Sequence, residues 1–342
     1  MFPMARSGSS TPYHATAAEI STFASATVAS GAYGNVGRNL LHNALFNVQQ
    51  RGTGPWTSGY TADRWALQSV TTGSVSASIG AISAASAASF SDEAAEHNLI
   101  ATVTAGTGVT EQIALQQNIE DVRRLSGKNV TVSFWAWVGS GTPKIGVELV
   151  QYFGSGGSPS AFVSVPMGAV TLSTTPTRYT LTVALPSVSG ATFGTTTGSD
   201  YTALSLWLSA GSNNATRASS IGLQSGTFEF WGMQLEIGSV ATPLEKIDPR
   251  LVLSNCQRFY CIGSGSWSFY ATAAGQYGLF TVPFAVRMRT APIVSISPAG
   301  GGGYSTVAGY AATPDSFVMQ ATSSAVANPV YFNYSYTASA DL

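Results

Sequence analysis

Acidic side chains are the residues of this sequence that could cleave a glycosidic bond. Such hydrolysis needs two carboxyl groups about 5 to 10 Å apart, one of them acting as the acid. Adjacent residues of a strand point to opposite faces of the sheet, so neighbouring carboxylates qualify only within loops. Three pairs among the sixteen Asp and Glu residues come into question: Asp92 with Glu93, Glu120 with Asp121, and Glu229 with Glu236. We predict structural or solvated roles for them and no catalytic residue.

Histidine and cysteine form no reactive motif. His14, His42 and His97 do not form H-E-x-x-H or another two-histidine spacing, and G-x-S-x-G, G-x-G-x-x-G and P-loop motifs are missing. A Ser/His/Asp triad stays open as an alternative, since its members come from distant positions. Cys256 and Cys261 have bulky residues between them and no further soft ligand nearby. We therefore expect buried free thiols, no metal site and no cofactor.

Aromatic residues are the better candidates for ligand contact. A ring flanked by Asn, Gln and Asp side chains can stack on a sugar, because it presents an apolar face beside polar groups. Trp135, Trp137 and Trp207 occupy the polar side of their expected strands. The candidate ligand-binding residues are Trp56, Tyr60, Trp135, Trp137 and Trp207. The alternative is that loops or a neighbouring subunit cover both sheet faces and bury these rings.

The triplet Asp63-Arg64-Trp65 has two interpretations. It could be an ion pair that binds a ligand. We favour an internal clamp, because arginine makes bidentate bonds to carboxylates and its plane stacks on aromatic rings. Asp63, Arg64 and Trp65 are therefore predicted to be structural.

The composition is poor in charge. Charged residues make up 9% of the chain, against roughly 25% in average globular proteins. Hydrophobic residues make up 44%, and the net charge is −1. The chain therefore lacks the basic field that nucleic-acid binding needs. No apolar run approaches the roughly 18 residues that span a bilayer, and the first residues do not form a secretory signal. Such a surface suits a protein that is largely covered by copies of itself, or one that must be durable outside the cell.

Period-two alternation predicts an antiparallel β-sandwich. Apolar and polar residues alternate at 130–138, 145–149, 179–185, 204–208 and 228–233. Turn sequences such as GSGTP and GSGGSP separate these runs, and no helix of βαβ length intervenes. The stretch WGMQLEIGSVATPLE (231–245) is then the closing strand and its exit. Gln234 and Glu236 should be half exposed there, and residues 241–250 should form an extended linker.

Local patterns assign the other segments. Residues 1–38 are predicted to be an attachment segment with a short helix at 17–29, which follows a capping-box spacing. A strand-like apolar run covers 40–52, low-complexity sequence covers 76–91, and a short helical or looped segment covers 113–125. The fold class is therefore all-β: a sandwich at 39–246, followed by a second small β domain at 247–342.

Three stretches carry specific motifs in a fixed order: residues 37–65, 117–137 and 230–260. The first contains N-L-L-x-N-x-x-F-x-x-x-Q-R-G and Y-T-A-D-R-W, and the second contains G-K-x-V-T-x-S-F-W. The third contains Q-L-E-x-G-x-x-A-T-P-x-E and C-Q-R-x-Y. Together they resemble the tail-fibre and receptor-binding proteins of tailed bacteriophages and prophages. One departure is Asn43-Ala44, where the family often has Asn-Gly, which puts a tight turn in question.

The resemblance implies a jelly-roll sandwich like that of carbohydrate-binding modules, in a homotrimer. It implies a structural virion protein, a tail fibre or spike that contacts host surface polysaccharide by multivalent binding. Other virion proteins would contact the N-terminal segment, and the candidate attachment residues are Tyr13, Glu19, Ile20 and Phe23. Two alternatives stay open: an architectural head, collar or decoration fibre without a ligand, and a capsule-degrading hydrolase that uses Glu120 or Glu236.

Overall fold

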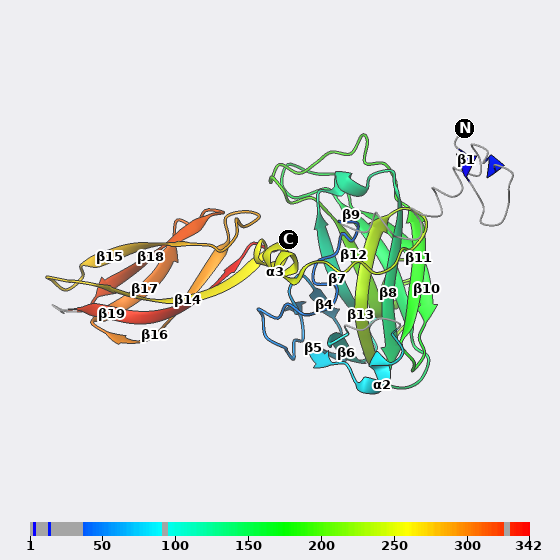
Figure 1. Ribbon diagram of the computed structural model, residues 1–342, viewed down its shortest axis with the longest axis horizontal. Coiled ribbons are helices and arrows are strands. Elements are labelled where there is room, and N and C mark those ends of the chain that lie inside the picture. Colours follow the sequence, from blue (N-terminus) through cyan, green and yellow to red (C-terminus); the bar gives the residue numbers. More distant parts are fainter. Residues whose placement is uncertain (1–2, 5–12, 15–36, 91–94, 325–328) are drawn as a thin grey trace.

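The computed structural model describes residues 3–4, 13–14, 37–90, 95–324 and 329–342. Two β-rich units follow one another, with helix α3 (Pro249–Gln257) between them (Figure 1). At the start of the chain, β1 (Pro3–Met4) pairs with β2 (Tyr13–His14), which contains the candidate attachment residue Tyr13. The other three attachment candidates and the predicted helix at 17–29 lie outside the described residues.

The larger unit is an antiparallel β-sandwich, which confirms the predicted fold class. Its six-stranded sheet has the order β10-β9-β12-β7-β4-β3 and its five-stranded sheet the order β11-β8-β13-β6-β5. The strands are β3 (Gly59–Tyr60), β4 (Ala66–Val70), β5 (Ser74–Ala81), β6 (His97–Thr104), β7 (Gln112–Glu120), β8 (Asn129–Val138), β9 (Lys144–Tyr152), β10 (Val163–Thr171), β11 (Thr177–Ala184), β12 (Tyr201–Ala210) and β13 (Gly226–Ile237). Most connections cross between the two sheets, which is jelly-roll winding.

The closing stretch 231–245 forms β13 and its exit, as predicted, but its outer face is buried. Gln234 and Glu236 are 1% and 2% exposed rather than half exposed. The chain after β13 folds back over them: Thr242 N donates to Glu236 Oε1 at 2.9 Å, and Glu245 N donates to Gln234 Oε1 at 2.8 Å. The expected extended linker is therefore packed against the strand that it leaves.

Residues 40–52 form turns instead of the expected strand. Asn43 has a φ of 52°, and its carbonyl accepts a bond of 3.2 Å from Phe46 N. Asparagine tolerates this left-handed conformation, and Ala44 does not adopt it, so the tight turn forms with the sequence Asn43-Ala44. Leu41 and Phe46 are 0% and 1% exposed and pack into the sandwich core. The run thus fills one part of the core without forming a strand, and two backbone bonds join it to β13: Leu40 N donates to the Leu235 carbonyl at 2.9 Å, and Met233 N donates to the Ala44 carbonyl at 3.1 Å.

Six strands of this sandwich were not predicted: β3, β4, β5, β6, β7 and β10. In β7 and β5, amide or small side chains hide the alternation. The segment predicted as helical or looped at 113–125 contains β7, where Ile113, Leu115 and Ile119 point into the core; only Val122–Leu125 is a 3₁₀ helix, η1. The low-complexity segment contains β5 and the short helix α2 (Ala84–Ala87). In both strands, apolar residues lie two apart on the inner face.

The second unit is a small sandwich of two three-stranded sheets, with the orders β14-β19-β16 and β15-β18-β17. Its strands are β14 (Tyr260–Phe269), β15 (Tyr277–Pro283), β16 (Ile293–Gly302), β17 (Tyr304–Tyr310), β18 (Ser316–Ser323) and β19 (Val330–Ser339). Helix α3, which the sequence prediction missed, begins with Asp248 as its N-cap and Pro249 in the first turn. Proline suits that position because the first helical N–H has no intrahelical partner.

Candidate functional site

A shallow hollow of about 140 Å³ lies on the outer face of the six-stranded sheet. It is lined by Gln116, Val150, Tyr152, Phe162, Tyr201, Ala203 and Arg217. Side chains alternate across a sheet, so β9 and β12 direct Leu149 and Leu204 into the core and the tyrosines at their ends to this outer face. The hollow therefore follows from the register of two central strands, while loops add the phenylalanine and the arginine.

Tyr152 and Tyr201 form the aromatic part of this hollow. They are paired across β9 and β12, and their ring centroids lie 4.8 Å apart with planes tilted by 28°. Both side chains are half-buried. Burial, aided by Tyr152, raises the pKa of Tyr201, so the phenol stays protonated at neutral pH. Neither hydroxyl has a hydrogen-bond partner among the described residues, which leaves two neutral polar groups beside an apolar stack.

Arg217 is the cationic group at the hollow, and a buried carboxylate fixes it. Glu148 is 0% exposed and accepts bonds from Arg217 Nε and Nη2 at 2.8 and 3.1 Å. Glu148 also accepts from Trp207 Nε1 at 2.9 Å and from the Ser164 hydroxyl at 2.5 Å. The guanidinium carbon lies 5.1 Å from the Trp207 ring and 5.3 Å from the Phe162 ring. Four donors thus neutralise the carboxylate and hold the guanidinium beside the hollow.

The loop that carries Arg217 covers one end of this sheet face. The 3₁₀ helix η2 (Ser212–Asn214) starts the loop, and Ala218 packs onto β9 at Gly146. A Cβ at position 146 would lie 2.3 Å from the Ala218 carbonyl oxygen, so only glycine permits this approach. Trp207 lies beneath the loop and is fully buried, which leaves the face open only toward the tyrosine pair.

The structure places the predicted ligand-binding tryptophans away from this hollow or beneath it. Trp207 and Trp137 are 0% and 3% exposed, so neither has a ring face free for a sugar. Phe90, which follows α2, packs on Trp135 and Trp137 at centroid distances of 5.1 and 5.8 Å and leaves Trp135 half-buried. Trp56 is half-buried too and packs against the sandwich core. Coverage by loops, the alternative interpretation, accounts for these rings.

Asp63, Arg64 and Trp65 are buried, as a structural role predicts, but they do not form the predicted clamp with one another. Asp63 accepts two bonds of 2.8 Å from Gln50, and burial raises the pKa of its carboxyl. Arg64 lies over the ring of Phe259, with its guanidinium carbon 3.3 Å from the centroid, and it does not stack on Trp65. Trp65 instead packs on Phe46 at 5.7 Å inside the core. The side chains of Arg64 and Trp65 point in different directions because Arg64 has a left-handed backbone conformation, with a φ of 72°.

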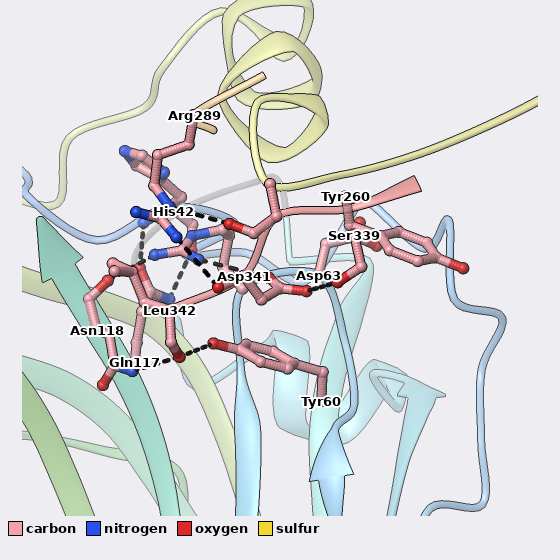
Figure 2. A network of polar contacts seen from close by, with 12 residues as sticks. His42, Tyr60, Asp63, Gln117, Asn118, Tyr260, Arg289, Ser339, Asp341 and Leu342 are labelled. Atoms are coloured by element: carbon pink, nitrogen blue, oxygen red, sulfur yellow. Dashed lines mark hydrogen bonds and ion pairs between the residues drawn. The ribbon is translucent and has the colours of Figure 1, made fainter. Parts of the chain in front are cut away.

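Asp63 and Arg64 border a polar junction between the two units, in which Figure 2 shows Asp63 near Asp341 and Ser339. Arg64 also donates to the Asn118 carbonyl at 2.5 Å and lies 3.7 Å from Asp341. Tyr60, a predicted ligand contact, donates its hydroxyl to the Leu342 backbone oxygen at 2.7 Å. The same oxygen accepts from Asn118 Nδ2 at 3.0 Å. The residues of this network thus fix the second unit on the first.

A second, mainly apolar hollow of about 330 Å³ borders the junction. It is lined by residues 42–45 and 47–50, by Glu245 and Ile247, and by residues of helix α3 such as Leu253. Burial, aided by Arg64, Arg124 and Arg258, lowers the pKa of His42 to about 3. The Glu245 carboxylate accepts from the backbone N–H groups of Gly37 and Asn39, the latter at 2.6 Å. This hollow therefore has few free polar anchors for a ligand.

The candidate hydrolytic carboxylates all have protein partners where the structure describes them. Arg258 Nη2 donates to both oxygens of Glu120 at 2.8 and 3.0 Å. Glu236 accepts bonds from the backbone N–H and the hydroxyl of Thr242, as a structural role predicts. Glu229 accepts from Asn98 Nδ2 at 2.6 Å. Asp121 accepts from Arg123 N at 3.0 Å, while Asp92 and Glu93 lie outside the described residues.

The remaining candidates for chemistry are the two cysteines, the histidines and the possible metal ligands. Cys256 and Cys261 are free and buried, which confirms that prediction, and burial raises the pKa of Cys261 to about 11. His97 Nδ1 lies 3.3 Å from Asn47 Oδ1 at the surface. Among the described residues, no group of three or more His, Cys, Asp and Glu side chains is placed to hold a metal ion. No helix in the same part of the chain is long and apolar enough to cross a membrane.

The sequence prediction missed four residues of the hollow: Tyr152, Phe162, Tyr201 and Arg217. Two of them could have been identified from the sequence. The tyrosines stand at the ends of two apolar runs, and antiparallel pairing brings such ends together. Phe162 and Arg217 lie in loops whose course the alternation does not specify. The prediction favoured tryptophan because it has the larger ring, but the fold buries Trp137 and Trp207.

Comparison with known proteins finds distant structural likeness. No protein-family model matches the sequence, and no curated protein matches it either. The enzymatically active domain of tailspike protein 4 from bacteriophage CBA120 is 13% identical with a TM-score of 0.34; the match covers 58% of this chain and 21% of that one. The CBM22-2 xylan-binding domain from Paenibacillus barcinonensis is 13% identical with a TM-score of 0.33, over 54% and 99% of the two chains.

A third similar structure is the family 11 carbohydrate-binding module from Clostridium thermocellum, solved with a mixed-linked tetrasaccharide. It is 10% identical with a TM-score of 0.30, and the match covers 53% of this chain and 91% of that one. The chain thus spans about a fifth of the tailspike domain and nearly all of each module. Its resemblance to tail-fibre proteins stays a prediction from the sequence motifs.

Proposed function

We propose that this protein binds glycans through the hollow at Tyr152, Tyr201 and Arg217. The observation that carries the proposal is the tyrosine stack, with centroids 4.8 Å apart, beside a guanidinium that Glu148 holds at 2.8 Å. A pyranose ring has an apolar face that packs on aromatic rings and a rim of hydroxyls that exchange hydrogen bonds with phenol, amide and guanidinium groups. Fixed side chains lose little entropy on binding, which favours such weak contacts.

The charge distribution at the hollow favours a neutral or weakly acidic sugar. The Arg217 charge is balanced by Glu148, whose four donors leave no free carboxylate oxygen for the ligand. Gln116 adds an amide on the neighbouring strand β7. Phe162 is 50% exposed and offers a further apolar surface at the edge. The ligand contacts would therefore be stacking and hydrogen bonds more than ion pairs.

In this proposal the protein is a structural virion component, a trimeric tail fibre or spike of a tailed phage. The motifs at 37–65, 117–137 and 230–260 and the 9% charged content support this setting. Weak sugar sites repeated over three chains and several fibres would gain avidity without any new contact. Residues 1–38 would attach the fibre to other virion proteins, and assembly would take place in the host cytoplasm.

We expect no enzymatic activity, because the carboxylates that could cleave a glycosidic bond have structural partners. Glu120 is held by Arg258, and Glu236 by Thr242. The test combines two measurements on the purified protein: binding to host cells and their extracted polysaccharide, and release of reducing ends. Binding without release supports the proposal. Release that is lost in Glu120→Gln would establish the hydrolase, and a fibre that binds no polysaccharide would be architectural.

A further inference from the structure

The second unit contains few charged residues. Residues 259–342 contain four charged side chains: Arg287, Arg289, Asp315 and Asp341. Arg287 pairs with Asp315, and Arg51 pairs with Asp341. Arg289 donates to the Gly198 carbonyl of the larger unit at 2.8 Å. Three of the four charged side chains are thus in ion pairs, Arg289 is held by backbone carbonyls, and Arg289 and Asp341 belong to the junction.

One face of this unit is rich in aligned hydroxyl side chains. The outward residues of β14, β19 and β16 form cross-strand rows, because antiparallel register places them opposite one another. One row is Ser264, Ser335 and Ser297; the next is Ser266, Asn333 and Ala299. The full set of exposed residues on this hydroxyl face is Ile262, Ser264, Ser266, Ser268, Ile293, Ser295, Ser297, Ala299, Tyr331, Asn333, Ser335 and Thr337.

Two hollows follow one another along the hydroxyl face. The first, of about 420 Å³, is lined by residues around Ser264, Ser335 and Thr337. The second, also of about 420 Å³, is lined by residues around Ser266, Asn333 and Tyr331. Both use the central strand β19, whose residues 331 to 337 span roughly 20 Å at the usual strand rise. A linear ligand that lies along β19 would therefore fill both hollows.

Asn333 lies where the two hollows meet and has a free donor. The Ser266 hydroxyl donates to Asn333 Oδ1 at 2.6 Å and thereby fixes the amide. Within the described part of the chain, Asn333 Nδ2 has no acceptor. Tyr331, next on the same face, is 53% exposed and offers its ring to solvent. Together they provide one oriented donor and one stacking surface inside a field of hydroxyls.

We propose that the hydroxyl face binds a neutral polysaccharide chain, lying along β19, at a site separate from the tyrosine hollow. A sugar chain matches the face in chemistry, since both sides present hydroxyls that donate and accept. The lack of charge excludes strong attraction for acidic or basic partners. A second copy of the protein would bury these polar rows, whereas interface cores between subunits are mainly apolar. The ligand is therefore a neutral chain of several sugar rings.

The test uses the full-length protein with Tyr201→Ala, which removes the tyrosine stack, so that failure at one site does not obscure the other. In this background, Ser335→Lys places a long cation between the two hollows. The matched control is Gln320→Lys on β18, the central strand of the opposite sheet. The probe is a glycan array that carries neutral and acidic bacterial polysaccharides, and thermal unfolding checks the fold of each variant.

The expected result is retained binding to one or more neutral polysaccharides, weakened about tenfold or more by Ser335→Lys and unchanged by Gln320→Lys. Asn333→Ala should weaken the same binding without introducing a charge. Loss of all neutral binding in Tyr201→Ala alone would overturn the proposal. Equal effects of the two lysine substitutions would also overturn it. A change of molar mass in light scattering with Ser335→Lys alone would show that copies of the chain cover this face, and would overturn it as well.

Discussion

The guanidinium carbon of Arg64 lies 3.3 Å from the centroid of the Phe259 ring, inside the junction between the two units. Arg64 comes from the loop before β4, and Phe259 follows helix α3. Burial lowers the pKa of Arg64, while Tyr60 and Asp341 act in the opposite direction. The cation is therefore kept charged by its partners and ties the second unit to the first through an aromatic ring.

Loss of this contact should destabilise the protein. Phe259→Leu keeps most of the apolar volume and removes the ring, so we expect the free energy of unfolding to fall by about 2 kcal/mol, the usual worth of a desolvated cation–π contact. Urea unfolding followed by tryptophan fluorescence measures this change. Arg250→Ala is the matched control, because Arg250 is 91% exposed and pairs with Asp248 at the surface. An effect of Phe259→Leu no larger than that of the control would contradict this role.

Buried His42 should make stability depend on pH. Its pKa is about 3 in the folded protein and 6.5 in an ordinary environment. Between these values the unfolded chain binds a proton that the folded chain does not, so the free energy of unfolding falls as the pH falls from about 6.5. The largest slope for one proton is about 1.4 kcal/mol per pH unit.

The variant His42→Phe isolates this contribution, since a phenylalanine ring can keep the edge contact with Phe259, whose centroid lies 5.9 Å away. Unfolding is measured in urea at intervals from pH 7 to pH 4. The stability difference between wild type and variant should grow steadily in favour of the variant toward low pH. Parallel curves for the two proteins would show that His42 does not titrate as described.

Neither cysteine should react in the folded protein. Both thiols are buried, and burial raises the pKa of each, that of Cys261 to about 11. The thiolate is the reactive species, so iodoacetamide at pH 8 should label no thiol under native conditions and two after denaturation. Mass spectrometry of the intact protein counts the labels. Native labelling at either position would contradict the burial of that side chain.

Light scattering should give a molar mass of about three times 35.4 kDa. The physical reason is apolar exposure: Val240 is 70%, Tyr277 61% and Val109 58% exposed in the single chain. Apolar surface of this kind marks contact sites between proteins. A monomer across the concentration range would contradict the proposed trimer. Deletion of residues 1–38 should leave this mass ratio unchanged and abolish incorporation into virions.

Alternation was a reliable guide in β8, where Val130, Val132 and Phe134 alternate with Thr131 and Ser133. It failed in β7, where Gln116, Gln117 and Asn118 interrupt the pattern, although Gln117 is buried and bonds to the backbone of His42. Amides can occupy a core position when the fold supplies partners, and these partners lie far away in sequence. Local patterns therefore indicate the strands but not every inward residue.

The binding hollow was less predictable than the sandwich. Trp207 has the sequence features of a surface aromatic, yet the loop around Arg217 buries it and uses its N–H to hold Glu148. Burial of this kind depends on where a loop returns to the sheet, which Gly146 permits by its lack of a side chain. The tyrosine pair results from the register of two strands that are 49 residues apart at their contact. Neither relationship is encoded in a local motif.

The most direct test of the proposed function is the affinity of the protein for host surface polysaccharide before and after Tyr201→Ala. Tyr310→Ala serves as the control, because Tyr310 is a 42% exposed tyrosine on β17, far from the hollow in the sequence and in a different sheet. We predict that Tyr201→Ala weakens binding about tenfold or more, as expected for an aromatic hot spot, and that Tyr310→Ala leaves it unchanged. Equal affinity of wild type and Tyr201→Ala, with both proteins folded, would contradict glycan binding at the tyrosine hollow.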